Sequence, residues 1–393
     1  MGPLDGIRVL DFTRVVAGPL ATRILADQGA EVIKVEPPEG DLSRTFPPLL
    51  ANEITPYFAQ QNAGKQFCSF DLSQKRTPEL LRELAQKCDI IVENFRPGVM
   101  AKYGLDYENL SEGNPRLVYC SITGFGQTGP WAKRRAYAPI GHLESGFVEY
   151  DRRKNERLAR QPASVLGDSV TALSAAASIN ALLVQAERTG KGGYLDVCMI
   201  ESLVYIQEWV STELAGGWEI TNGGFCHESP ILELPDGQLW GVAGSPIAWF
   251  SDLAKAIGRP ELINDPRFAE PGVREQYKEE IIAMLTEWAS SFANFDEFLT
   301  ALESKSPFTA AQMMSIDDLA SSEWAGHREL LVGTNTELRI PARNAQGVDI
   351  GTNGRLAHRG ADNELVLSTV LGLTESEIDL LKEAGVLLSA SGR

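Results

Sequence analysis

Residues 7–36 read IRVLDFTRVVAGPLATRILADQGAEVIKVE, and this stretch decides the fold. It opens with a short apolar run, Ile7 to Phe12, which is typical of a buried strand. Gly18 to Gln28 then places aliphatic side chains at helical spacing, and Gly29 ends that predicted helix. A second apolar run, Glu31 to Glu36, predicts the next strand. A strand, a helix and another strand in close succession form the repeating unit of a parallel sheet.

The same alternation continues along the first half of the chain. Apolar periodicity predicts a helix over residues 77–87, and short apolar runs predict strands over 89–93, 116–122 and 194–199. A helix is expected from about residue 201 to residue 214. Strands that alternate with helices indicate the α/β class, in which helices cover both faces of a parallel sheet.

The sequence changes character after residue 224. Two apolar runs flank Pro235-Asp236-Gly237, a strong turn signal, and predict a β-hairpin, while residues 275–292 predict an amphipathic helix. We therefore expect a Rossmann-like parallel-sheet domain formed from N- and C-terminal parts, with a smaller inserted α+β domain. The predicted ranges are 1–224, 225–325 for the insertion, and 326–393 for a C-terminal segment that returns to the large domain. A capping-box pattern at Thr374 to Glu377 starts the last helix, which is expected to dock through Ile378, Leu380, Leu381 and Val386.

The composition limits the classes of partner and the compartment. The chain of 393 residues carries a net charge of −17, which argues against nucleic acid as a partner. The amino terminus shows no export signal and no apolar run suggests a membrane span, so we expect a cytoplasmic protein. Five scattered cysteines without a CxxC pair predict free thiols, and no metal site is expected. Basic residues gather at 133–135 and 152–154, where either a solvated surface or a phosphate site is expected.

Asp168 is the most informative single residue. It stands where an extended segment gives way to a long helix rich in alanine and serine, and Gly167 precedes it. Aspartate is a favoured helix N-cap, so a purely structural role fits the local pattern. A helix N-terminus also favours the charged form of a carboxylate, which a nucleophilic aspartate needs.

Two further motifs lie at predicted strand ends. Residues 124–129, GFGQTG, match a dinucleotide-binding fingerprint in letters, but Pro130 and Trp131 follow where the helix should continue, so a glycine loop is the favoured interpretation. Residues 93–99, ENFRPGV, close a buried strand, at the edge where open α/β sheets bind ligands. Phe95 is suited to stacking on a flat ring, and Arg96 or Lys102 to meeting phosphate, although a structural loop remains an equal alternative.

A series of stretches in order resembles the family III coenzyme A transferases, which include formyl-CoA and carnitine CoA transferases and the α-methylacyl-CoA racemases. The matching stretches are residues 4–36, 93–99, 119–130, 167–168, 188–202 (RTGKGGYLDVCMIES), 265–268 (DPRF) and 359–386. The resemblance implies a CoA-binding Rossmann-like domain and an interlocked homodimer. It also implies transfer of CoA from an acyl-CoA to an acceptor carboxylic acid, with no permanently bound cofactor.

The resemblance also assigns roles to particular residues. It implies that Asp168 is the nucleophile and forms first an anhydride and then an aspartyl-CoA thioester. Asn94, Phe95 and Lys102 match positions that contact the nucleotide end of CoA, and Arg135 matches a basic residue that meets the phosphates. The remaining implied site residues border the thioester or the acyl group; they are Val16, Ala17, Tyr57 and Tyr137.

Departures from the family pattern keep two alternatives open. Ala138 stands where many transferases have an acidic residue, His142-Leu143 replaces a Gln-Ala pair, and Gly223-Gly224 is all that remains of a four-glycine loop. These differences favour a larger or more apolar acyl group than formyl or oxalyl. One alternative is a racemase-like isomerase, although Tyr137 and Ala138 occupy the positions of its His-Asp pair. The other is a CoA-binding paralogue without catalysis.

Overall fold

The computed structural model describes residues 2–49, 54–154, 158–208, 210–216, 229–332, 337–338, 351 and 354–390. The chain forms two compact units. Unit 1 consists of Met1–Gln207 together with Ala325–Arg393, and unit 2 consists of Glu208–Trp324. The predicted boundary between residues 224 and 225 lies outside the described residues, and the predicted domain limits remain predictions.

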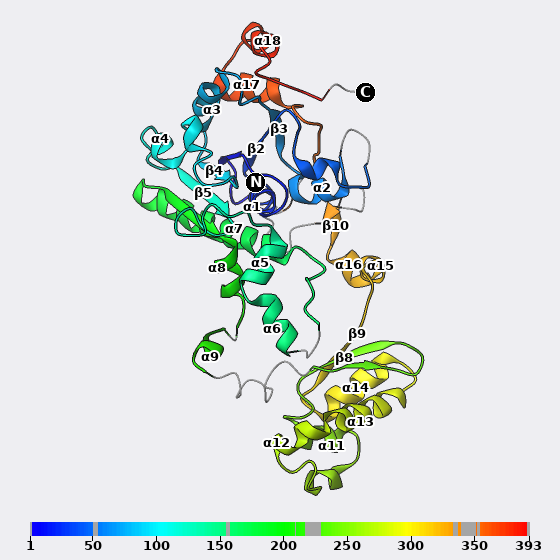
Figure 1. Ribbon diagram of the computed structural model, residues 1–393. Helices are drawn as coiled ribbons and strands as arrows, with labels where there is room; N and C mark the ends of the chain where they lie inside the picture. The colour runs from blue at the N-terminus through cyan, green and yellow to red at the C-terminus, as the bar shows by residue number, and fades with distance from the viewer. Residues whose placement is uncertain are drawn as a thin grey trace. The chain divides into compact units, whose positions relative to one another are not determined.

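A parallel sheet forms the centre of unit 1 (Figure 1). Within the described residues its six strands follow the order β3-β2-β1-β4-β5-β6, and every neighbouring pair is parallel. The strands are β1 (Arg8–Asp11), β2 (Glu31–Glu36), β3 (Gln66–Ser69), β4 (Ile90–Glu93), β5 (Val118–Thr123) and β6 (Gly193–Cys198). This is the doubly wound strand order, in which ligands bind where the order reverses, here between β1 and β4. The predicted α/β class with a Rossmann-like sheet is confirmed.

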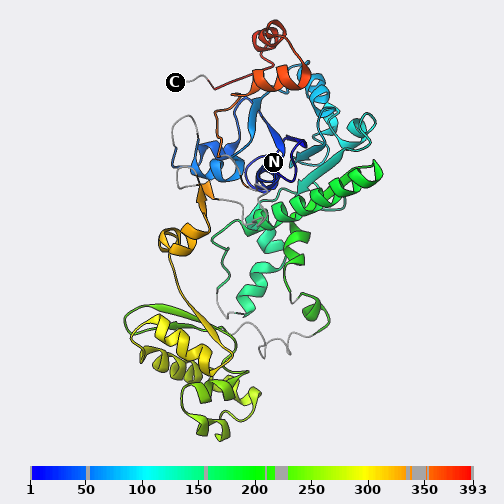
Figure 2. The same cartoon turned by 180° about the vertical axis from the view of Figure 1, so that it is seen from behind.

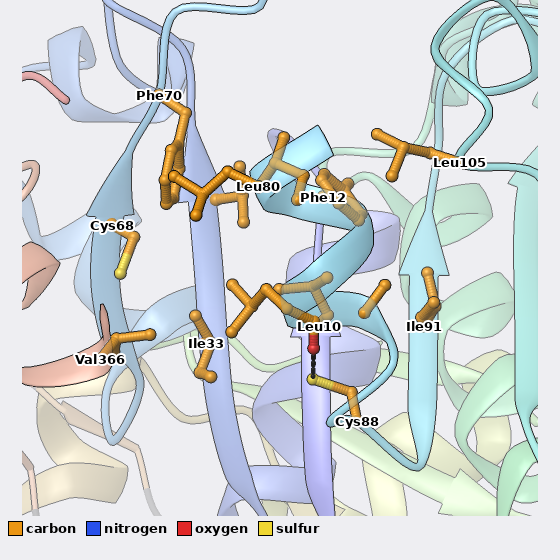
Figure 3. Close-up of a cluster of buried hydrophobic side chains, with 14 of the residues drawn as sticks. Leu10, Phe12, Ile33, Cys68, Phe70, Leu80, Cys88, Ile91, Leu105 and Val366 are labelled. Carbon is orange, nitrogen blue, oxygen red and sulfur yellow. Dashed lines mark hydrogen bonds between the residues drawn. The ribbon is translucent and has the colours of Figure 1, made fainter. Parts of the chain in front are cut away.

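Apolar cores lie on both faces of this sheet. On one face α1 (Ala17–Asp27) and α7 (Leu166–Thr189) pack against the strands, and on the other face α3 (Thr77–Ala85) and α17 (Asn363–Leu371) do so. β1 shows why, because consecutive side chains point to opposite faces: Val9 joins the first core and Leu10 the second. Figure 3 shows the second core, with Leu80 of α3 and Val366 of α17 among the strand side chains.

The other elements of unit 1 connect or flank these layers. They are η1 (Leu42–Thr45), α2 (Pro56–Asn62), η3 (Ala101–Tyr103), α4 (Tyr107–Ser111), α5 (Ala138–Glu144), α6 (Phe147–Lys154), α8 (Met199–Tyr205), β10 (Leu331–Val332), β11 (Glu337–Leu338) and α18 (Glu375–Glu383); α16 (Glu323–His327) spans the border with unit 2. The predicted capping box of α18 is confirmed at Thr374 and Glu377. Docking through Ile378, Leu381 and Val386 is also confirmed, whereas Leu380 is exposed.

Unit 2 is a small α+β body. Its antiparallel sheet follows the order β7 (Ile231–Glu233), β8 (Leu239–Ala243), β9 (Thr309–Gln312), and the predicted hairpin turns at Asp236-Gly237. The core of the unit combines Trp240 of β8 with side chains of three helices. Its helices are α9 (Val210–Leu214), α11 (Phe250–Ala256), α12 (Pro271–Arg274), α13 (Lys278–Ser290), α14 (Phe295–Lys305) and α15 (Ile316–Ser321), with 3-10 turns at η4 (Pro260–Asn264) and η5 (Glu275–Tyr277).

The helix predicted over residues 201–214 is wrong as one element. α8 ends at Tyr205, and α9 begins only at Val210. At this end of α8 the Gln207 side-chain amide donates to the carbonyl oxygen of Leu203, and it also donates to that of Ser145, which follows α5. Apolar periodicity does not reveal such a side-chain contact.

α7 is the one helix among the described residues that is long and apolar enough to cross a membrane, with a mean hydropathy of 1.4. It contributes Ala172, Ala175 and Ile179 to the core that it shares with α1 and the sheet. Figures 1 and 2 show it as the long green helix beside the sheet. One face of α7 therefore packs on the parallel sheet, and 33% of its apolar stretch is buried. It nevertheless departs from the sequence-based expectation that no apolar run would suggest a membrane span.

Candidate active site

A cavity of about 600 Å³ opens in unit 1 where the strand order reverses. Its walls come from the segments after β1, β4 and β5 and from the starts of α1, α5 and α7. The lining residues are Arg14, Val15, Val16, Ala17, Leu42, Phe46, Tyr57, Asn94, Phe95, Arg96, Pro97, Ile122, Thr123, Gly124, Ala132, Arg134, Arg135, Ala136, Tyr137, Ala138, Pro139, Val165, Asp168 and Met199. Asp168 is the only carboxylate in this lining.

Asp168 lies in the first turn of α7, and it is not the N-cap. Val165 occupies the N-cap position, and no side chain caps the helix there. The Asp168 carboxylate instead lies near the backbone N–H groups of Ala17 and Ala138, which favour its charged form. Since those residues are the first of α1 and α5, three helix N-termini meet at one carboxylate. Such termini favour an anion through their unpaired N–H groups and their dipoles.

Burial acts on the same carboxylate in the opposite direction. It raises the pKa of Asp168 to about 6, although the backbone N–H groups of Ala17 and Ala138 favour the charged form. At neutral pH the carboxylate is therefore mostly ionised, but it is more basic than an ordinary aspartate. That combination suits attack on a carbonyl carbon.

Buried side chains hold the loop that carries the Ala17 N–H group. The Asn94 side chain accepts from the N–H of Arg14 and donates to its carbonyl oxygen, at 2.9 Å in each case. The next residue, Val15, has a positive φ of 69°, which is unusual for a β-branched residue. Its N–H points at Asp41, and Asp41 forms a buried ion pair of 3.0 Å with Lys34. Asn94 and Asp41, which lie outside the loop, therefore hold its conformation.

The lining of the cavity carries several positive charges and aromatic rings. Arg14, Arg96, Arg134 and Arg135 all line it, although the whole chain is strongly acidic. The Arg14 guanidinium lies 5.3 Å from the centre of the Phe95 ring. A concave site with clustered arginines attracts an anionic ligand such as a phosphate ester.

Aromatic and apolar side chains line the cavity as well. Phe46 and Tyr57 pack edge to face, with ring centres 5.1 Å apart, and Tyr137 adds an exposed ring. Burial and the negative charge of Asp168 raise the pKa of the Tyr57 phenol. The phenol therefore keeps its proton at neutral pH and can donate a hydrogen bond close to Asp168.

The cavity brings together eight of the nine predicted site residues. Asp168, Val16, Ala17, Tyr57, Asn94, Phe95, Arg135 and Tyr137 line it, and the exposed Lys102 on η3 does not. The predicted Gly223-Gly224 loop lies outside the described residues. Sequence reasoning missed Arg14, Phe46 and Met199, although Arg14 follows β1 directly and its place at a strand end was a usable signal.

The remaining motifs are placed by the structure. Residues 124–129 form a glycine loop, as predicted, and the next helix starts only at Ala138. Of the two basic clusters, Arg134 and Arg135 reach the cavity, whereas Arg152 pairs with Glu149 on α6. No group of three or more His, Cys, Asp or Glu side chains among the described residues could hold a metal ion.

Comparison with known proteins gives one consistent family. The family model described as CoA-transferase family III matches residues 4–353. Succinyl-CoA:glutarate CoA-transferase of Mus musculus is 35% identical over 85% of this chain and 77% of its own length. Formyl-CoA:oxalate CoA-transferase of Streptomyces coelicolor is 30% identical over 98% of this chain and 99% of its own. The crystal structure of a CAIB/BAIF family protein from Brucella suis superimposes with a TM-score of 0.78, at 28% identity, over 94% of this chain and 99% of that one.

Proposed function

The chain belongs to CoA-transferase family III and is a CoA-transferase, and from this premise we propose that Asp168 is the nucleophile of the transfer. The observation that carries the proposal is the meeting of three helix N-termini at this one carboxylate in the cavity. Those N–H groups are already in place before any charge develops in the reaction. Preorganised donors of this kind are a major source of transition-state stabilisation.

The proposed reaction has two symmetrical halves. The Asp168 carboxylate attacks the thioester carbonyl of the acyl-CoA, which forms an anhydride and expels CoA as a thiolate. The thiolate attacks the Asp168 carbonyl carbon, which gives an aspartyl-CoA thioester and releases the donor acid. The acceptor carboxylate then attacks the aspartyl-CoA thioester, which forms a second anhydride and expels the CoA thiolate. The thiolate attacks the acyl carbonyl carbon of the acceptor, which gives the new acyl-CoA and restores the Asp168 carboxylate. Every bond broken is replaced by one formed, so neither a redox cofactor nor a permanently bound group is required.

Particular residues fit particular steps of this scheme. The N–H groups of Ala17 and Ala138 can stabilise the oxyanions formed at the Asp168 carbonyl, and the Tyr57 phenol can donate to the acyl oxygen. We assign the nucleotide end of CoA to Asn94, Phe95 and Arg135, which line the cavity. Lys102 is assigned to the same end of CoA from outside that lining.

We propose dicarboxylic acids as the substrate class. The relatives named above act on succinyl, glutarate and oxalate groups according to their names, and a further relative is named succinyl-CoA:mesaconate CoA-transferase. A second carboxylate on the acid also suits the arginines of the lining. The aromatic pair of Phe46 and Tyr57 instead favours the other expectation, which is a larger or more apolar acyl group.

A half-reaction experiment tests both parts of the proposal. Enzyme mixed with succinyl-CoA and no acceptor should release one equivalent of succinate per active site while the CoA stays bound to protein. Glutaryl-, oxalyl- and hexanoyl-CoA, tested in the same way, measure the preference for a second carboxylate. Asp168→Asn should release none, whereas Asp296→Asn, in the first turn of α14, should behave like the wild type. Turnover that requires donor and acceptor together, without the single-equivalent release, would contradict the covalent scheme.

We further propose that the enzyme acts in the cytoplasm as a homodimer. Free thiols at Cys68, Cys88, Cys120 and Cys198 are consistent with a reducing compartment. α7 supports the dimer, because Leu173 and Val184 are 58% and 48% exposed on a helix that is otherwise rich in alanine. A second copy of the chain would remove these apolar side chains from water.

A further inference from the structure

A buried imidazole connects α5 to the start of α7. His142, in the second turn of α5, is 2% exposed, and its Nε2 accepts a hydrogen bond of 2.9 Å from the backbone N–H of Gly167. Gly167 immediately precedes Asp168 in the first turn of α7, where backbone N–H groups have no partner within the helix. No side chain of α7 itself caps this turn. His142 therefore supplies from a neighbouring helix the acceptor that the turn lacks.

The hydrogen bonds around the ring fix its tautomer. Because Nε2 accepts from Gly167, the ring proton belongs on Nδ1, which lies 3.0 Å from the side-chain oxygen of Gln161. The Gln161 amide nitrogen in turn donates to the carbonyl oxygen of Pro139, in the first turn of α5. The hydrogen bonds that lead from the His142 ring through Gln161 therefore return to α5 at Pro139. Each donor meets an acceptor, so the ring is held in one orientation.

Two contacts join α5 and α7 at the site. The Gly167 N–H of α7 donates a hydrogen bond to His142 of α5, and the Ala138 N–H of α5 favours the charged form of the Asp168 carboxylate. Both helices also lie close against α8, because Gly141 and Gly167 face Met199, where an added Cβ would lie 2.7 Å and 3.1 Å from the Met199 sulfur. The contacts between α5 and α7 therefore determine where the Asp168 carboxylate lies relative to the Ala138 N–H group.

We propose that His142 is a positioning residue for CoA transfer, which holds the first turn of α7 so that Asp168 meets the N–H groups of Ala17 and Ala138. The inference rests on the proposed role of Asp168 as the nucleophile. It also gives His142 a role other than that of a proton-transferring base. Its Nε2 lone pair is occupied by a backbone N–H and its Nδ1 proton by Gln161, so neither nitrogen faces a substrate.

Three variants separate positioning from packing. His142→Gln keeps an oxygen that can accept from Gly167, and His142→Phe keeps a ring but no acceptor. Gln161→Leu leaves the buried ring in place and removes the exposed partner that fixes its tautomer. For each variant, the kcat and the KM for succinyl-CoA, the release of succinate without acceptor and the thermal unfolding midpoint should be measured.

Positioning predicts a loss of kcat with little change in KM. We expect His142→Phe to lower kcat about 100-fold, because a small displacement of a reacting group has effects of this size. His142→Gln should recover most of that loss, and Gln161→Leu should show a smaller loss with an unchanged unfolding midpoint. A fully active Phe variant, or a folded Gln variant as slow as the Phe variant, would overturn the inference. If His142→Phe does not fold, an unchanged kcat in Gln161→Leu would overturn it instead.

Asp168→Asn separates this inference from the proposal on which it rests. If Asp168→Asn retains turnover, the nucleophile assignment fails, whatever the His142 variants do. If Asp168→Asn is inactive and His142→Phe transfers CoA at the wild-type rate, only the positioning role fails.

Discussion

At Asp168, burial and the neighbouring backbone N–H groups act on the carboxyl group in opposite directions, and burial has the larger effect on its pKa. The sequence predicts the charged form from the helix N-terminus alone, because the helix is visible in the local pattern. The burial comes from α1 and α5, whose closeness to α7 cannot be seen in that pattern. The residue is therefore recognisable from the sequence, whereas its basicity is a property of the fold.

The pH dependence of the reaction should follow this carboxyl group. Burial raises the pKa of Asp168 to about 6, and only the anion can attack a thioester. We expect kcat/KM for succinyl-CoA to fall about tenfold for each pH unit below about 6. Steady-state rates from pH 4.5 to pH 8, with unfolding checked at each pH, measure this. A rate that stays constant down to pH 4.5 would argue against Asp168 as the nucleophile.

The same pKa predicts that Asp168 costs stability. A carboxyl whose pKa is higher in the folded state than its ordinary value of 3.8 binds its proton more tightly when folded. Folding is therefore opposed as the pH rises from about 4 to about 6 and the group ionises. We expect Asp168→Asn to raise the free energy of unfolding above pH 7 by up to about 3 kcal/mol. Urea unfolding at pH 7.5 and at pH 4 checks this, since the difference should vanish at pH 4. A variant less stable than the wild type at pH 7.5 would contradict it.

At the scale of the element, the loop between β1 and α1 depends on residues outside itself. Asp11 and Asp41, paired with Lys65 and Lys34, hold the backbone around the positive φ of Val15. The sequence predicts β1, α1 and β2 well, because each has its own apolar period. It does not predict the loop conformation, since the partners of Asp11 and the Asp41–Lys34 pair come from β2, from the residue before β3 and from the segment before η1. The same reason explains why the Gln207 contacts at the end of α8 have no sequence signal.

Asp41→Asn tests whether this loop needs its ion pair. The Lys34 charge and two hydrogen bonds from Ser43 hold the pKa of Asp41 at about 2, so its contribution to stability is present above pH 4 and is lost as the pH falls toward 2. We expect the variant to lose about 3 kcal/mol at pH 7, because Lys34 stays buried without its full partner. Succinate release should slow as well. Glu83→Gln, an exposed residue on α3, is the control and should change neither quantity.

At the scale of the whole molecule, the site is assembled from segments far apart in the chain. The rule that open parallel sheets bind ligands at the strand ends locates Asn94, Phe95 and Arg96 from the sequence. It does not locate His142 or Tyr57, which reach the site through helix packing. Unit 1 itself is closed by the C-terminal segment, where the Asp362 and Asn363 side chains accept the N–H groups of Phe67 and Ser69 on the edge strand β3.

The oligomeric state is a prediction at the same scale. Multi-angle light scattering of the purified protein, measured over a hundredfold range of concentration, should give twice the mass of one chain throughout. The exposed apolar side chains on α7 provide the physical reason. A mass of one chain at every concentration would contradict the proposed dimer and leave the assignment of Asp168 untouched.

The covalent role of Asp168 is the central claim, and intact-protein mass spectrometry tests it most directly. The enzyme is incubated with succinyl-CoA, quenched, weighed and digested, and Asp168→Asn is treated in parallel. The wild type should gain the mass of CoA as a thioester or of the succinyl group as an anhydride, on the peptide that contains Asp168. The variant should gain neither. An adduct on another residue, or full turnover without any adduct, would contradict a covalent role for Asp168.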